Sequence, residues 1–313
     1  MLNTYYCNGI IKVIEIWFDD DINFDIPNAD IIVSYSRSRP FNPKRWLYSY
    51  TILINLAISS KILLENMDTM TVRQIRRAET NDGTECVYYR NPTPQNIKEF
   101  VTFYNDFATA FGLSTATFQR LALFDRYGLL GLSEAKSKGK SLVWHAYLTH
   151  RQHGRAMALL SASGRRWNQN KTTCNLISRA NRLLHFQDMV SLKEQGYRFY
   201  DFGGWYSGTE DRKLLQINSF KERFGGSIVY GYDSEEPLNL RGRLYLAYCP
   251  LRWRFCNPQT LKEFRRRRRE AAAPATHHQS AWSFLNMAGD GGGMGKSPPG
   301  ISSARGKRAI LLT

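Results

Sequence analysis

GYRFYDFGGWYSGTEDRKLLQINSFKERFGG, residues 196–226, contains a predicted strand, a polar loop and a short amphipathic segment. A helix stop at Gly196 precedes the aromatic strand Tyr197–Phe202, and the pair Gly203–Gly204 opens the loop. A second glycine pair, Gly225–Gly226, ends the stretch. Because rigid elements position the functional groups of the loops between them, a loop region with an acid, a lysine and two glycine pairs indicates a site.

The segments around this stretch predict an α/β fold. The strongest helix is expected over Asn175–Gln195, where apolar residues follow the helical period. Residues 131–135, 141–149 and 157–162 are expected to form antiparallel strands joined by basic turns. Helices inserted into a largely antiparallel sheet give a mixed α/β layer fold. The other expected elements are strands at Ile10–Phe18, Ala29–Tyr35, Tyr50–Leu56, Cys86–Tyr89 and Ser227–Tyr232, and helices at Lys61–Glu79, Gln95–Phe111, Thr115–Leu123 and Leu214–Phe224.

Composition divides the chain into four regions. Residues 1–49 are predicted strands and loops, 50–240 the main domain, and 241–264 an aromatic and basic helical extension. Residues 265–313 begin with five arginines, continue with alanine, proline and glycine, and are predicted to be a disordered basic tail. Within that tail, Asp290 stands where a P-loop needs its first glycine, so DGGGMGKS is rejected. The pair His277–His278 lacks further ligands, so no metal site is expected.

The chain is strongly basic, with a net charge of +16 over 313 residues. Residues 263–313 hold nine Lys/Arg and three acids, so +6 of this charge lies there and about +10 in the body. A basic body favours anionic partners such as phosphates, nucleotides, RNA or acidic lipid surfaces. No apolar run reaches the ~18 residues that a transmembrane segment needs. The five scattered cysteines without a CxxC pair indicate a reduced, cytoplasmic chain.

Four stretches carry a resemblance to a known family. They are the strand and helix at 50–79 that end in IRRAE, NRLLHFQDMVSLKEQG at 181–196, YDFGG at 200–204 and INSFKERFGG at 217–226. Over about residues 50–232 the chain resembles the Fem-type branch of the GNAT acyltransferase superfamily. The resemblance implies a GNAT-like acyltransferase domain over 50–240. The two-lobed Fem enzymes have two such domains, whereas this chain has room for one.

The resemblance also implies a reaction. Fem-type enzymes move an amino acid from its tRNA ester to an amine of a peptidoglycan precursor, and single-domain relatives use acetyl-CoA. The chain is therefore expected to transfer an acyl group, from acetyl-CoA or aminoacyl-tRNA, to an amine or hydroxyl of a cell-wall or polysaccharide precursor. Expected partners are an anionic sugar-nucleotide or lipid-linked precursor, tRNA and a peripheral membrane surface. The alternative is a catalytically inactive GNAT-like module that binds RNA or an anionic surface, which the net charge and the arginine run favour.

By the family motif, Phe220 and Lys221 lie at the acyl-transfer centre. A fixed ammonium beside the reacting carbonyl stabilises the oxyanion of acyl transfer. The alternative for Lys221 is a solvated lysine on a short helix. Asp201 either orients the acceptor or bonds the amides of the following loop, and Gly203 and Gly204 allow close backbone approach. The residues expected to line the acceptor cleft are Tyr206, Arg212 and Arg223.

Two basic segments are candidate phosphate sites. RQHGRA at 151–156 fits the R-x-x-G-x-A pattern of acetyl-CoA binding, with Arg151, Gly154 and Arg155 near the pyrophosphate. A strand is predicted to follow it, so the alternative is a basic hairpin turn. Arg76–Arg77, at the end of a predicted helix, either face a phosphate or complement the helix dipole.

Overall fold

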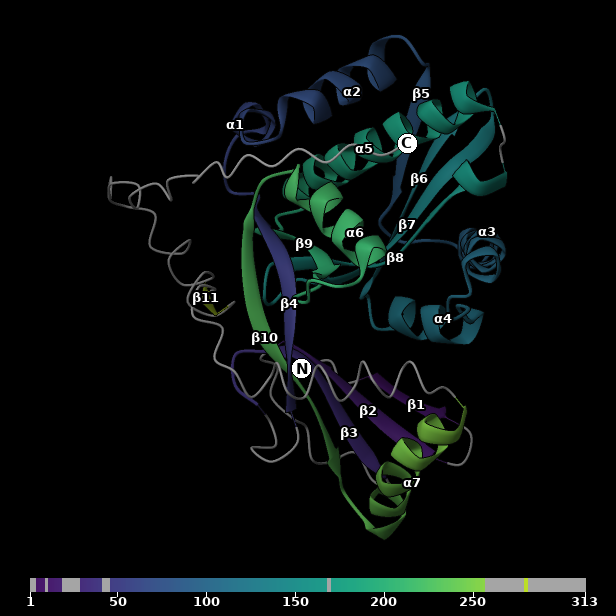
Figure 1. Cartoon of the computed structure of the whole chain (residues 1–313), viewed down its shortest axis with the longest axis vertical. Coiled ribbons are helices and arrows are strands. Elements are labelled where there is room, and N and C mark those ends of the chain that lie inside the picture. Colours follow the sequence, from purple (N-terminus) through teal and green to yellow (C-terminus); the bar gives the residue numbers. More distant parts are fainter. Residues whose placement is uncertain are drawn as a thin grey trace.

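A computed structural model describes residues 4–8, 11–18, 29–40, 46–167, 170–256 and 279–280 of the chain (Figure 1). Almost all of the predicted tail at 265–313 lies outside these residues. The elements are β1 (Thr4–Asn8), β2 (Ile11–Trp17), β3 (Ile31–Arg37), β4 (Trp46–Asn55), α1 (Ser60–Glu65), α2 (Thr69–Thr80), β5 (Thr84–Tyr89), α3 (Pro94–Phe111), α4 (Phe118–Arg126), β6 (Leu130–Ser137), β7 (Lys140–His150), β8 (Arg155–Ser163), the 3-10 turn η1 (Gly164–Trp167), α5 (Lys171–Glu194), β9 (Phe199–Gly204), α6 (Arg212–Glu222), β10 (Ser227–Pro237), α7 (Leu240–Cys256) and β11 (Gln279–Ser280).

The strands of the described residues form one mixed sheet in the order β1-β2-β3-β10-β4-β9-β8-β7-β6-β5, with β11 beside β10. Neighbouring strands are antiparallel except for the parallel pairs β2–β3, β8–β9 and β10–β11. The predicted α/β fold with a largely antiparallel sheet and flanking helices is therefore confirmed. No helix in the described part of the chain is both long and apolar enough to cross a bilayer.

Helices cover both faces of this sheet because the central strands alternate between two cores. On β7, Tyr147 packs on the side of α2 and α5 with Leu183 and Met189. Its neighbours Trp144 and Leu148 pack on the other side with residues of α3 and α4. Figure 1 shows α2 lying along α5 above the sheet, and these two helices contact each other. This leaves a seam between α2 and α5 at the surface.

The predicted helix over Lys61–Glu79 is wrong in one respect, because the chain forms two helices, α1 and α2. Asp68 ends the connection between them, and its side chain accepts a hydrogen bond from Thr71 N as the N-cap of α2. An aspartate at this position satisfies an otherwise unpaired amide of the first turn. The break lets α2 start in a new direction and run beside α5.

The amino-terminal strands and the helix α7 meet at one edge of the sheet. Leu246 of α7 packs on Ile11, Val13 and Ile31 of the amino-terminal strands. The helix α7 lies within the predicted extension at 241–264, apart from its first residue. In Figure 1 this region occupies the lower part of the molecule, and α1, α2 and α5 occupy the upper part.

The parallel pair β8–β9 creates an opening in the sheet. Their pairing runs from Arg155 opposite Phe199 to Met157 opposite Asp201 and stops there. Both strands continue beyond this point, β8 to Ser163 and β9 to Gly204. The motif residues of 196–226 follow directly at the end of β9.

Candidate active site

Lys221 is held at the end of β9 by backbone carbonyls. Its ammonium donates hydrogen bonds to the carbonyl oxygens of Gly203, at 3.1 Å, and Gly204, at 2.5 Å. Burial lowers the pKa of Lys221 to about 8, and the nearby Asp201 carboxylate opposes this shift. The side chain is therefore not the solvated lysine of the alternative interpretation. A third N–H of the ammonium is available for a ligand carbonyl.

The turn that holds Lys221 requires glycine. Gly203 has φ +65°, and a Cβ atom on it would lie 2.5 Å from the carbonyl oxygen of Ala158. Its amide donates a 2.8 Å hydrogen bond to Oδ1 of Asp201. A side chain at Gly203 would thus displace either the strand β8 or the carbonyl that binds Lys221.

Asp201 supports this turn from within the core. The residue is fully buried, and its Oδ2 accepts hydrogen bonds from Arg155 Nε at 2.8 Å and Nη2 at 2.5 Å. Oδ1 lies beside the hydroxyl of Thr51 and accepts from Gly203 N. The hypothesis that Asp201 touches the acceptor is corrected here, because a fully buried carboxylate with these donors faces the protein. Its loop-amide role is the one that the contacts support.

The candidate phosphate segment RQHGRA forms the hairpin turn between β7 and β8. Arg151 is exposed, Gly154 has φ +57°, and the strand β8 follows at once. Arg155 is 1% exposed, pairs with Asp201 and stacks on Phe18 with 4.3 Å from its guanidinium carbon to the ring centre. Because the turn leads into no helix N-terminus and Arg155 is committed to Asp201, the pyrophosphate hypothesis loses its physical basis.

Phe220 lines a cavity of about 240 Å³ beside α5. Arg182 stacks over the Phe220 ring with 5.1 Å between its guanidinium carbon and the ring centre, and its Nη1 donates to Ser178 O. Burial lowers the pKa of Arg182, and the nearby Arg223 and Arg165 lower it further. The cavity thus joins an aromatic wall to arginine charge, which suits an acyl group with an anionic neighbour. The lining residues are Gln74, Ser163, Arg165, Ile177, Ser178, Asn181, Arg182 and Phe220.

The three predicted cleft residues lie around α6 but do not line this cavity. Tyr206 is buried, and its backbone exchanges two hydrogen bonds with the Asn218 side chain, which ties the loop to α6. Arg212 is exposed at the start of α6, and Arg223 is exposed at its C-cap. Arg223 lies near enough to affect Arg182 electrostatically. The structure therefore brings together Asp201, Gly203, Gly204, Phe220 and Lys221.

A buried polar network behind Phe220 is a feature that sequence reasoning missed. Asp188 Oδ2 lies 2.8 Å from His145 Nδ1 and accepts a 2.5 Å hydrogen bond from Tyr147 OH. Tyr147 OH also lies 2.9 Å from Tyr200 OH, and His185 Nδ1 lies 2.6 Å from the Tyr200 hydroxyl. The available signal was the spacing of these polar residues. His145 and Tyr147 are two apart on the buried strand β7, and His185 and Asp188 are three apart on the buried stripe of α5.

This network reaches the cavity. His145 Nε2 lies 2.9 Å from Oδ1 of Asn181, which lines the cavity wall, and the His185 ring centre lies 5.6 Å from that of Phe220. His145, His185 and Asp188 also have ligand-type atoms within 4.8 Å of one another. The two imidazole rings stack at 4.1 Å with 27° between their planes, however. Stacked rings direct their in-plane lone pairs to different points, so this arrangement fits a hydrogen-bond network better than a metal centre.

The neutral state of His185 predicts a pH dependence of stability. Burial first, and then His145, Lys221 and Arg182, hold the pKa of His185 well below its usual 6.5. Below pH 6.5 the unfolded chain binds a proton at His185 that the folded chain does not, so the free energy of unfolding falls as the pH falls. Between pH 7.5 and 5.5 the wild type should lose about 1 kcal/mol more than His185→Phe in urea unfolding. Identical losses in both proteins would show that His185 is not held neutral.

The chain has an acyltransferase-like fold, which comparison with solved structures shows. Similarity to the crystal structure of FemX has a TM-score of 0.52 at 12% identity and covers 78% of this chain and 85% of that one. The predicted resemblance to the Fem-type branch is confirmed for the fold. L-PGS from Bacillus licheniformis is similar at a TM-score of 0.47, with 12% identity over 78% of this chain and 84% of that one. An aminoglycoside acetyltransferase from an uncultured soil metagenomic sample is similar at 0.30, with 12% identity over 45% of this chain and 89% of that one. No family profile and no curated protein sequence matches the chain.

Proposed function

We propose that this protein is an acyltransferase that moves an acyl group to an amine or hydroxyl of a cell-wall or polysaccharide precursor. The observation that carries the proposal is Lys221, a half-buried ammonium that two carbonyls hold at the end of β9, adjacent in sequence to Phe220, which lines the cavity. The FemX fold supports the reaction class, and the arginines of the cavity match a donor or acceptor that carries phosphate.

The proposed chemistry needs one fixed cation. The lone pair of the acceptor nitrogen or oxygen attacks the acyl carbonyl, and the carbonyl oxygen becomes an oxyanion. The remaining N–H of Lys221 stabilises that charge. Collapse of the intermediate breaks the bond to the leaving group, either the CoA thiolate or the tRNA ribose oxygen. The acceptor proton then goes to the leaving group or to solvent.

Other residues of the site position Lys221 and the acyl group. Arg155 and Asp201 fix the amide of Gly203, and this orients the carbonyls that receive the ammonium. Phe220 provides an apolar wall for the acyl chain, and Arg182 lies over the outer face of that wall. The acceptor is proposed to be an anionic sugar-nucleotide or lipid-linked precursor.

Transfer assays with separate donors test this proposal. Acetyl-CoA and aminoacyl-tRNA are each offered with amino-sugar and peptidoglycan-precursor acceptors, and mass spectrometry follows the acylated product. We expect turnover with one donor class. Absence of product with both donors, together with retained binding of RNA or anionic vesicles, would favour the inactive binding module instead.

A further inference from the structure

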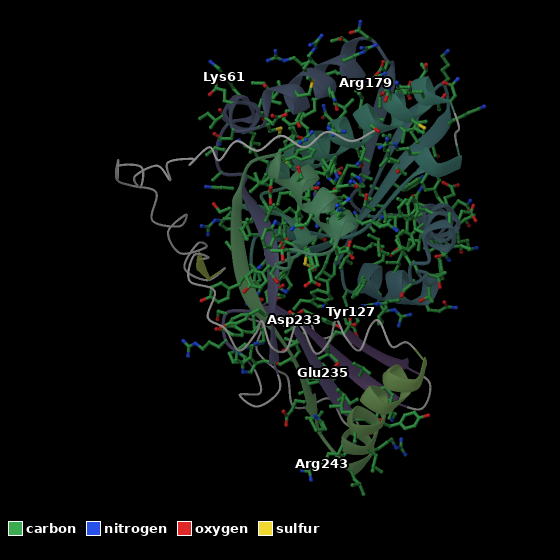
Figure 2. All side chains as sticks on the ribbon, viewed as in Figure 1. Lys61, Tyr127, Arg179, Asp233, Glu235 and Arg243 are labelled. Carbon is green, nitrogen blue, oxygen red and sulfur yellow. The ribbon has the colours of Figure 1, made fainter. Side chains whose placement is uncertain are left out.

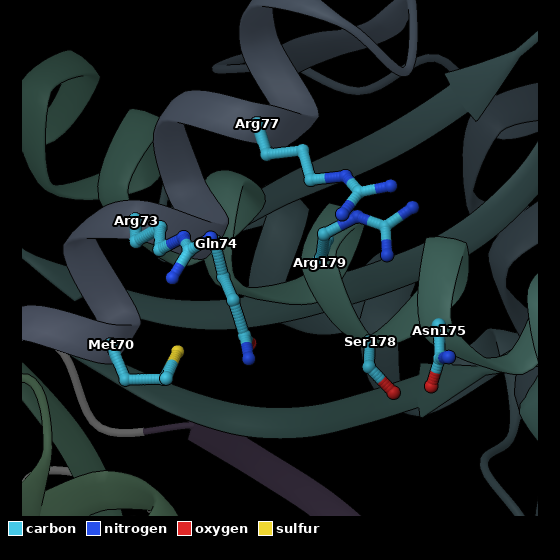
Figure 3. A pocket seen from close by; sticks show the side chains of 7 residues that line it. All are labelled: Met70, Arg73, Gln74, Arg77, Asn175, Ser178 and Arg179. Atoms are coloured by element: carbon cyan, nitrogen blue, oxygen red, sulfur yellow. The ribbon is translucent and has the colours of Figure 1, made fainter.

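A second cavity, of about 300 Å³, lies on the seam between α2 and α5 (Figure 3). It shares Gln74 and Ser178 with the Phe220 cavity, so the two hollows are neighbours along one groove. Figure 2 places Arg179 in the upper part of the molecule, far from the acidic Asp233 and Glu235. The lining residues are Met70, Arg73, Gln74, Arg77, Asn175, Ser178 and Arg179.

The lining is built almost wholly from hydrogen-bond donors. Arg73 and Arg77 are one helical turn apart on α2 and therefore face the same side. Asn175 and Arg179 have the same spacing on α5 and face them across the seam. Guanidinium, amide and hydroxyl groups on both walls provide more donors than the cavity can satisfy from its own acceptors.

Among the described residues, the three guanidinium groups of the cavity are paired with a single carboxylate, that of Asp82. Figure 3 shows the side chains of Arg77 on α2 and Arg179 on α5 extending to the same side, with their guanidinium groups near each other in this view. Arg179 donates through Nε and Nη2 to the carboxylate of Asp82, which fixes its orientation. Among the described residues, neither Arg73 nor Arg77 is paired with a carboxylate. Like charges that face each other repel, and an anion between them reverses this cost.

We propose that this cavity binds a phosphate group of a nucleotide-type ligand. The planar forks of arginine match phosphate oxygens two at a time, and the amides of Gln74 and Asn175 add neutral donors. Of the two earlier interpretations of Arg76–Arg77, the phosphate interpretation then applies to Arg77, since Arg76 does not line the cavity. Because the groove leads to Phe220, the phosphate belongs to a substrate whose reacting end lies at Lys221. This last step rests on the proposed function.

Two sources of phosphate fit the cavity, and small probes distinguish them. Adenosine 3′,5′-bisphosphate represents the nucleotide of CoA, and UDP represents a sugar-nucleotide acceptor, whereas inorganic pyrophosphate tests the shared chemistry alone. Calorimetric titration of the full chain with each probe gives its affinity. Tighter binding of the bisphosphate assigns the cavity to the donor, and tighter binding of UDP assigns it to the acceptor.

Arg77→Gln and Arg76→Gln form a matched pair that removes equal charge from adjacent positions of α2. Removal of a charge-assisted phosphate contact should weaken pyrophosphate binding by about tenfold or more in Arg77→Gln, with less than about twofold change in Arg76→Gln. Equal weakening in both variants, or no binding by the wild type, would overturn the phosphate site. Lys221→Met should bind pyrophosphate as the wild type does. Intact pyrophosphate binding by a wild-type chain that transfers no acyl group from either donor would reject the proposed function and keep this site.

Discussion

Lys221→Met is expected to lower the rate of acyl transfer by about 10²–10³-fold, the loss typical of removing one oxyanion donor. The variant keeps the length and apolar stem of the lysine but places no charge at the carbonyls of Gly203 and Gly204. Because burial disfavours the ammonium, its removal should not unfold the chain. Single-turnover transfer with the active donor measures the rate, and circular dichroism verifies the fold.

Lys213→Met is the matched control for this experiment. Lys213 lies on the same helix, α6, but its side chain is exposed. The Lys213→Met protein should transfer acyl groups within about twofold of the wild-type rate, since surface substitutions rarely perturb a site. A Lys221→Met protein that works as fast as Lys213→Met would remove Lys221 from the reaction.

Arg155→Met should destabilise the fold by about 3–5 kcal/mol, because it leaves the Asp201 charge buried without its partner. Arg155 is 1% exposed and gives two hydrogen bonds to Asp201 Oδ2. Methionine preserves the contact with the Phe18 ring, so lost charge pairing dominates the effect. Urea unfolding at pH 7 gives the free energies.

Two further variants separate the pairing from a general loss of packing. Arg151→Met changes an exposed arginine of the same hairpin turn and should cost less than about 0.5 kcal/mol. The double variant Arg155→Met with Asp201→Asn removes the stranded charge, and it should recover about 1–3 kcal/mol of the loss. A double variant as unstable as Arg155→Met would contradict the account of this ion pair.

Local signals predicted most of the fold. Helical periodicity predicted α5. Pro94 and Gly112 mark the two ends of α3, and strand patterns with basic turns predicted β6, β7 and β8. Each of these signals depends on neighbours in sequence. The cap at Asp68 is also local, but a continuous apolar stripe on both sides hid the end of α1 and produced the one wrong helix.

Long-range contacts explain what the sequence could not predict. Arg155 lies in RQHGRA and Asp201 in YDFGG, two motifs far apart in the sequence. Only the parallel pairing of β8 with β9 brings the two residues together. His145 and Asp188 likewise meet because α5 packs over β7. The motif made Phe220 and Lys221 candidates, yet it could not show that the carbonyls of a glycine turn hold the lysine.

The pH dependence of single-turnover acyl transfer tests the central claim most directly. The acceptor should be an amine that is neutral over the whole range, so that its own titration does not contribute. If the ammonium of Lys221 stabilises the oxyanion, the rate should fall as the pH rises through about 8, the pKa to which burial lowers this lysine. A rate that stays level or rises between pH 7 and pH 10 would contradict the assignment.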